Sequence, residues 1–174
     1  QQFGVSRDRR NGGLYFARAI VADGRKVGIA VIKLNMTAMA SPVGAPTSVR
    51  GTPLWARRPA ARGLKVFAFK PIETGCEEVD GHLVGADQVV LREASGLDWP
   101  NGLYRFREPV APWVAAREAG EVINLRRVKT VLDDAPWEIA LVEGAGGWRV
   151  PITEAADMST LARLLGLPVV LVAR

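Results

Sequence analysis

Two charged residues stand where an apolar strand gives way to a turn, and their types suit phosphate chemistry. Lys70 ends the apolar run LKVFAFK (64–70), and Glu143 follows the apolar run WEIALV (137–142) and precedes the turn GAGG. A carboxylate at the end of a buried strand must be solvated, paired or bound to a metal. The glycines let the backbone approach a ligand and present N–H groups to it. Together these features favour a site for Mg²⁺ and an anion, as in phosphoryl transfer.

Each candidate also has a plainer interpretation. Lys70 fits a surface lysine at a strand end, and Glu143 fits a solvent-facing acid in a glycine-rich turn. Asp87 stands at the start of a predicted helix, where aspartate is a common N-cap as well as a metal ligand. The residue pattern leaves both interpretations open for each of the three.

The elements that must position these residues alternate between strand and helix. Apolar runs at 64–70, 137–142 and 168–174 predict buried strands. Helical patterns separate them, at 85–96, 109–120, 123–134 and from Thr153 or Asp157 to Leu165. This alternation predicts an α/β fold with a doubly wound, mostly parallel sheet, which is incomplete because the chain stops on a strand. We expect the three strands to be parallel neighbours.

Ligands of such sheets bind beyond the carboxyl ends of the strands. We therefore expect Lys70, Thr74 and Glu143 to cluster at that edge, with Asp87 nearby.

The first third of the chain has a different character. Residues 1–63 carry 11 of the 23 basic side chains and 2 of the 18 acidic ones, so they hold a net charge of +9 within a total of +5. A helix is predicted at 14–24 and a strand at 26–34, whereas recurrent prolines predict loop or disorder over 36–63. We therefore divide the chain into an atypical basic segment, 1–62, and an α/β domain, 63–174.

Composition excludes several classes of protein. A chain of 174 residues with 48% hydrophobic residues can form one packed domain. One cysteine and one histidine exclude a disulfide framework and a multi-histidine metal site. No apolar run approaches the ~20 residues that span a bilayer, and no signal-peptide core opens the chain, so we expect a cytoplasmic protein without membrane partners.

Five segments together resemble ATP-dependent dethiobiotin synthetase, an enzyme family of biotin synthesis. They occur in the family's order: FKPIETGCEE (69–78), GAD (85–87), YRFREPVAPWVAAREAG (104–120), VEGAGGWRVPITE (142–154) and LARLLGLPVVLVAR (161–174). The resemblance covers about residues 63–174 and implies a P-loop-NTPase-like fold. It also implies a cyclo-ligase that forms dethiobiotin from 7,8-diaminononanoate, CO₂ and ATP, with Mg²⁺, as a homodimer in the full-length protein.

The resemblance also implies a role for each matched residue. Lys70 corresponds to the lysine that binds the substrate carbamate and phosphates, and Thr74 to the hydroxyl residue that contacts the diamine. Asp87 and Glu143 correspond to the Mg²⁺ ligands that border ATP. The backbone that contacts nucleotide and substrate corresponds to Gly144, Ala145 and Gly146.

Two parts of the family pattern are missing from this sequence. The Walker A motif G-x-x-x-x-G-K-[ST] is absent, and SPVGAPTSVRGTP (41–53) stands near its expected place. The family's C-terminal part, with its adenine contacts and much of its dimer interface, lies beyond Arg174. We expect a fragment that is inactive by itself, and we interpret residues from about 40 to 60 as a frame-shifted reading of a GC-rich gene.

Two alternative functions remain open. One is another member of the P-loop superfamily, such as a cobyrinate-type amidating synthase or a partition-type ATPase. The other is a non-catalytic protein whose arginines between residues 50 and 62 bind nucleic acid. The basic segment lacks an aromatic reading face, so we expect no nucleic-acid partner.

Overall fold

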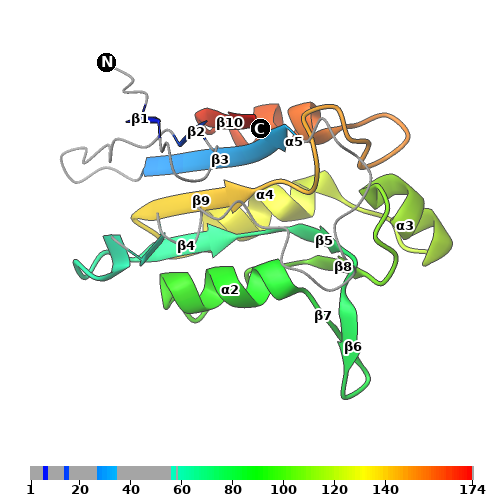
Figure 1. The fold of residues 1–174 in the computed structure, drawn as a ribbon, viewed down its shortest axis with the longest axis horizontal. Coiled ribbons are helices and arrows are strands. Elements are labelled where there is room, and N and C mark those ends of the chain that lie inside the picture. Colours follow the sequence, from blue (N-terminus) through cyan, green and yellow to red (C-terminus); the bar gives the residue numbers. More distant parts are fainter. Residues whose placement is uncertain (1–5, 8–13, 16–26, 35–55, 58, 174) are drawn as a thin grey trace.

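A four-stranded parallel sheet forms the centre of the molecule (Figure 1). The computed structural model describes residues 6–7, 14–15, 27–34, 56–57 and 59–173. The strand order is β10-β3-β9-β4, and every neighbouring pair is parallel. These strands are β3 (Val27–Leu34), β4 (Val66–Phe69), β9 (Ile139–Glu143) and β10 (Val169–Ala173). The predicted α/β fold with a mostly parallel sheet is therefore confirmed.

The predicted neighbour relations need one correction. β4 and β9 are adjacent, but β3 lies between β9 and β10. Val31 of β3 is in register with Glu143 on one side and with Val170 on the other. A segment of the atypical N-terminal third thus supplies a central strand. The pattern at 26–34 predicted this strand but not its position in the sheet.

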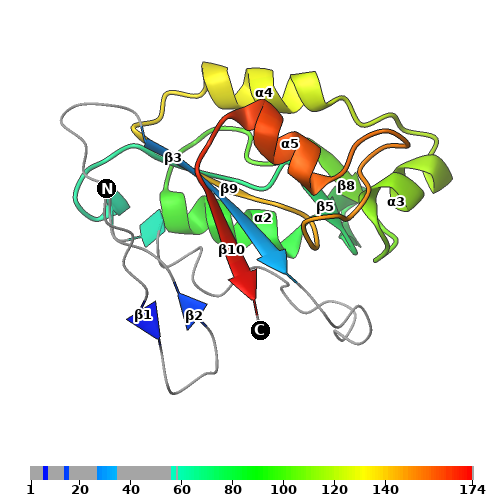
Figure 2. The same ribbon diagram turned by 90° about the horizontal axis from the view of Figure 1, so that it is seen from above.

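Helices cover both faces of this sheet. Helix α2 (Ala86–Ser95) packs against β4 on one face, and α4 (Leu125–Asp134) and α5 (Met158–Leu165) lie on the other (Figure 2). Phe67 and Phe69 of β4 stack on each other in the larger core, whereas Val66 and Ala68 join Leu91 in the smaller one. This alternation is the period-two geometry of a strand that is buried on both faces.

Local signals set the helix ends. The N-cap side chains are Asn124 for α4 and Asp157 for α5, and Asp157 forms a capping box with Thr160. Gly96 and Gly166 end α2 and α5 with positive φ angles of 66° and 69°, which glycine adopts without strain. Helix α3 (Pro112–Glu118) begins at a proline, where a missing N–H costs nothing. Of the two predicted caps for α5, Asp157 is the correct one.

Four short strands extend the carboxyl end of β4 and were not predicted. Strand β5 (Ile72–Thr74) pairs in parallel with β8 (Tyr104–Phe106). Strands β6 (Glu77–Val79) and β7 (His82–Val84) form a hairpin. Figure 1 shows β5 and β8 beyond β4, and the hairpin projecting from them.

Two predictions in the N-terminal third fail where the structure describes it. Leu14–Tyr15 form β2, which pairs antiparallel with β1 (Ser6–Arg7), and not the start of a helix, because tertiary pairing overrides a weak helical pattern. The rest of 14–24 lies outside the described residues, as does most of the predicted loop at 36–63. At the end of that loop the backbone is helical at Ala56, Arg57, Pro59 and Ala60. The bond from Ala61 N–H to Arg57 C=O closes this turn without needing an N–H from proline.

Within the described part of the chain, no helix is long and apolar enough to cross a membrane.

Candidate functional site

Lys70 and Glu143 meet because their strands are in register. Phe69 pairs with Val142, so the next residue of each chain segment, Lys70 and Glu143, stands at the same carboxyl edge. The Lys70 Nζ lies 3.2 Å from the Glu143 Oε1 and also donates a hydrogen bond to the Asp87 carboxylate. Lys70, Glu143 and Asp87 are 4%, 2% and 0% exposed. A cation and two carboxylates from three separate elements thus form one buried cluster.

The electrostatics of this cluster favour the charged lysine. Burial alone lowers the pKa of Lys70, but attraction to Glu143, and then to Asp87, outweighs it, so the pKa is raised above its usual 10.5. The ammonium therefore stays protonated throughout the physiological range. This positive charge is already paired with two carboxylates, so an anionic group could bind Lys70 only in place of one of them.

Glu73 caps helix α2 from outside the helix. The N-cap residue, Gly85, has no side chain to offer, and the Glu73 carboxylate accepts hydrogen bonds from the backbone N–H groups of Asp87 and Gln88, at 2.8 and 3.0 Å. A Cβ at Gly85 would collide with that carboxylate, so a larger residue there would displace the cap. Burial raises the pKa of Glu73 above 4.5. These two hydrogen bonds to Glu73 fix the first turn of α2 and thereby the position of Asp87.

The side chain of Gln88 and the backbone carbonyl of Asn101 hold the backbone of Lys70. The Gln88 Nε2 donates to the Lys70 carbonyl oxygen at 3.0 Å, and the Lys70 N–H donates to the Asn101 carbonyl oxygen at 2.9 Å. The Asn101 side chain in turn donates to the backbone carbonyl oxygen of Gln88. Both polar backbone groups of Lys70 are therefore tied to neighbouring segments, which limits the motion of its side chain.

The structure brings three of the candidate residues together, and the roles predicted for all of them stay predictions. Lys70, Asp87 and Glu143 come together as expected. Thr74 ends β5 and pairs with Phe106, and no described contact joins it to the cluster. The predicted binding backbone at Gly144, Ala145 and Gly146 directly follows Glu143, with Gly146 at φ 77°.

Asp87 is not the N-cap of α2, which was one of its two interpretations from the sequence. Gly85 is the N-cap of α2, and Asp87 lies inside the first turn with its carboxylate on Lys70. The common capping role is thus filled by Glu73. Sequence reasoning missed Glu73, Gln88 and Asn101, although the charge at position 73 directly beside buried Ile72 signalled a polar partner.

Asp87 and Glu143 form a donor set that fits Mg²⁺. This ion takes oxygen ligands and is commonly held by one or two carboxylates together with water and substrate phosphates. No group of three or more metal-binding side chains occurs among the residues that the structure describes. Two carboxylates alone would leave most of the coordination of such an ion to water and substrate.

Comparisons with known proteins agree with the sequence resemblance. A family model described as an AAA domain matches residues 59–174. A protein of Aromatoleum aromaticum is 40% identical over 116 residues, which are 63% of this chain and 51% of that protein. One of Pseudomonas paraeruginosa is 43% identical over 121 residues, with the same coverage of 63% and 51%. One of Pseudomonas aeruginosa strain UCBPP-PA14 is 39% identical over 137 residues, 75% of this chain and 58% of that protein.

All three relatives are named ATP-dependent dethiobiotin synthetase. The chain spans about half the length of the curated relatives that it matches. The comparisons therefore confirm the resemblance over the α/β part of the chain, and they do not favour a cobyrinate-type synthase, a partition-type ATPase or a nucleic-acid-binding protein.

Proposed function

The chain belongs to the AAA domain family, and we propose that it serves as part of an ATP-dependent dethiobiotin synthetase. Its fold is α/β and of the P-loop NTPase type, as the sequence predicted. The observation that carries the proposal is the buried cluster of Lys70, Asp87 and Glu143 at the carboxyl edge of the sheet. The same three residues lie in the segments that resemble the synthetase family.

In the proposed reaction an amine of 7,8-diaminononanoate captures CO₂ as a carbamate. ATP phosphorylates the carbamate oxygen to give a mixed anhydride, and the second amine then closes the ureido ring as phosphate leaves. The Lys70 ammonium would orient the carbamate anion and the transferring phosphoryl group, which is the positioning and charge stabilisation on which phosphoryl transfer depends. Thr74, four residues further along, would contact the diamine.

Asp87 and Glu143 would hold Mg²⁺ in this proposal. When bound, the ion neutralises negative charge on the phosphates. Lys70 would exchange one of its carboxylate partners for substrate, since it contacts both. Gly144, Ala145 and Gly146 would offer backbone N–H groups to nucleotide and substrate.

We propose that the 174-residue chain by itself binds ATP weakly and does not turn over. The sequence contains no Walker A motif, and that loop supplies the phosphate-binding amides and lysine. The full-length enzyme is proposed to act as a cytoplasmic homodimer. Size-exclusion chromatography with light scattering tests the dimer, and a monomer at micromolar concentration would contradict it.

The sharpest test of the function is binding of the substrates one at a time. Titration of the isotope-labelled chain with 7,8-diaminononanoate in bicarbonate should shift the amide signals of Lys70 and Thr74, whereas ATP with Mg²⁺ should bind more weakly than micromolar. The variant Lys70→Met should lose the diamine response, and Lys129→Met, at an exposed ion pair, should keep it. Absence of a saturable diamine response in the wild-type chain would refute the proposed substrate.

A separate test addresses the basic segment 1–62, which we propose to be partly frame-shifted. The stretch from Met36 to Gly63 contains no acidic residue, as wrong-frame translation of GC-rich DNA tends to give. Translating the two other frames across codons 36–62 should show G-x-x-x-x-G-K-[ST] in one of them. If neither frame contains it, the segment is a genuine basic extension.

A further inference from the structure

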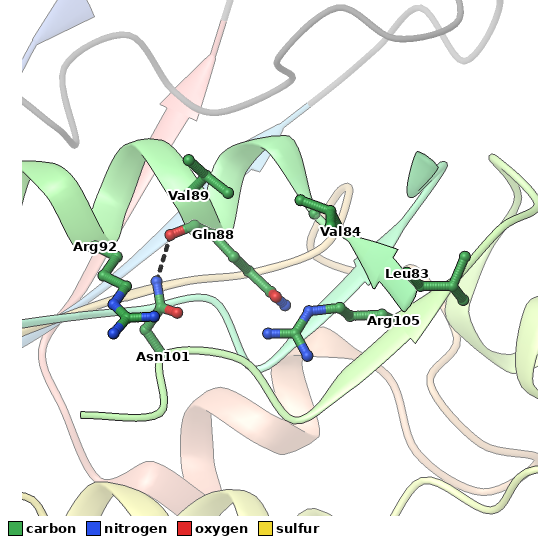
Figure 3. A pocket seen from close by; sticks show the side chains of 8 residues that line it. Leu83, Val84, Gln88, Val89, Arg92, Asn101 and Arg105 are labelled. Atoms are coloured by element: carbon green, nitrogen blue, oxygen red, sulfur yellow. Dashed lines mark hydrogen bonds between the residues drawn. The ribbon is translucent and has the colours of Figure 1, made fainter. Parts of the chain in front are cut away.

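A pocket lies beside the Lys70 cluster and is lined by other side chains than those of the cluster. It has a volume of about 120 Å³ and lies between α2, β7 and the segment that leads into β8 (Figure 3). Its polar lining consists of Gln88, Arg92, Asn101 and Arg105, and Val84 and Val89 contribute apolar surface. None of the three cluster residues lines it.

The side-chain oxygen of Gln88, Oε1, is a buried hydrogen-bond acceptor that the described residues leave unused. Gln88 is 2% exposed, and its Oε1 has no hydrogen-bond partner in the part of the chain that the structure describes. The orientation of the amide is fixed, because Nε2 donates to the Lys70 carbonyl oxygen at 3.0 Å and a flip would set two carbonyl oxygens against each other. Gly102 packs directly on this amide, and a Cβ at that position would collide with it. A buried acceptor held in this way needs a donor, which water or a ligand can supply.

Two guanidinium groups stand on either side of this acceptor. Figure 3 shows the Gln88 amide pointing toward Arg105, with Arg92 at the other end of the pocket beside Asn101. Arg92 is paired with Asp98, but the two side chains are 61% and 94% exposed, so that ion pair holds Arg92 only weakly. The pocket therefore offers cationic donors to an anion, and one acceptor that requires a proton on that anion.

We propose that this pocket binds a protonated oxyanion, with hydrogenphosphate as its simplest member. The arginines would donate to the charged oxygens, and the single O–H of hydrogenphosphate would donate to the Gln88 Oε1. Sulfate has the same shape and the same double negative charge but carries no proton at neutral pH. Bound sulfate would place an oxygen lone pair against the Gln88 oxygen, and a site built to bond an O–H rejects an analogue that lacks it.

The experiment compares the two anions on the wild-type 174-residue chain. Isotope-labelled protein at pH 8 is titrated with inorganic phosphate and, separately, with sodium sulfate at matched ionic strength, and amide shifts are followed. Phosphate should give a saturable response at Gln88, Asn101 and Arg105, with affinity at least about tenfold greater than that of sulfate. Equal affinities, no saturation in the millimolar range, or shifts confined to Lys70 and Glu143 would overturn the proposal.

Two variants test the contribution of the arginine. Arg105→Gln should weaken phosphate binding about tenfold, while Arg107→Gln should leave it within about twofold, because Arg107 pairs with Glu78 and does not line the pocket. Equal losses in both variants would show attraction to net charge only and would refute the site. If Arg105→Gln fails to fold, the comparison of phosphate with sulfate on the wild-type chain still decides. The readout needs neither ATP nor turnover, so its failure is distinct from failure of the proposed synthetase function.

Discussion

Replacing Lys70 by methionine is the perturbation whose cost the structure predicts most directly. Methionine preserves most of the side-chain volume but removes the ammonium that lies between Asp87 and Glu143. Removing one partner of a buried ion pair costs about 3–5 kcal/mol, because the remaining charges stay in a medium that solvates them poorly. For a chain of this size, each kcal/mol lowers the melting temperature by about 2–4 °C, so Lys70→Met should melt about 6–20 °C below the wild type.

Urea unfolding measures the loss in free energy, and thermal melting measures the shift in melting temperature. Both are followed by circular dichroism in buffer without Mg²⁺. Lys129→Met is the matched control, because Lys129 pairs with Asp133 one helical turn away on the exposed side of α4. Exposed pairs of this kind contribute about 0.3–0.5 kcal/mol. The raised pKa of Lys70 also predicts how stability depends on pH. The contribution of Lys70 to the free energy of unfolding is fully present below pH 10.5 and is lost as the pH rises beyond that value. The stability gap between wild type and Lys70→Met should therefore narrow only in strong alkali.

A triple variant separates lost charge balance from lost packing. In Lys70→Met/Asp87→Asn/Glu143→Gln, no buried charge remains in the cluster, and most of the cost of the single substitution should be recovered. A triple variant as unstable as Lys70→Met would mean that packing and not charge dominates. A loss below about 1 kcal/mol in Lys70→Met itself would refute the reasoning, since that is the range of exposed pairs.

Three further predictions concern other parts of the structure. Cys76 should react slowly with thiol reagents at pH 8 in the native chain and rapidly in urea. The reason is that burial, and then the negative charge of Glu73, raise the pKa of Cys76 to about 11. Equal reaction rates in the two conditions would contradict this. Glu73→Gln should lower the free energy of unfolding by about 1–3 kcal/mol, since it disrupts the cap of α2, and the exposed Glu77→Gln serves as the control. Hydrogen bonds from Ser159 and then from the Thr160 N–H lower the pKa of Asp157 to about 2. Its contribution to stability should therefore be present above pH 3.8 and disappear as the pH falls toward 2, and the acid-unfolding curve of Asp157→Ala should lack this step.

The sequence predicted those parts of the fold that depend on local pattern. Strand β4 is apolar on both faces, so its run of residues was visible without knowledge of its neighbours. The end of α5 was visible because Gly166 adopts a conformation that other residues avoid. Strands β5 and β8 were not visible, because each has three residues and its register is fixed only by the other.

The residues of the candidate site also divide into those that the local sequence pattern predicted and those that it did not. Lys70 and Glu143 were predictable because a charge at the end of an apolar strand conflicts with its surroundings. Glu73, Gln88 and Asn101 act through hydrogen bonds to backbone groups 13 to 18 positions away in the sequence. Such partners depend on how β5 and α2 pack, and no residue spacing encodes that packing.

The cap on α2 also constrains how this site can bind phosphate. The N-terminus of a helix is a common anion site, because its first N–H groups are free and its dipole attracts negative charge. In α2, however, the N–H groups of Asp87 and Gln88 already donate to the Glu73 carboxylate. The N-terminus of α2 is thus committed to an internal anion, and a phosphate at the Lys70 cluster must take its donors from elsewhere. Lys70 supplies one, and the backbone after Glu143 is the nearest source of others in the sequence, which is why the glycines at 144 and 146 matter to the proposed chemistry.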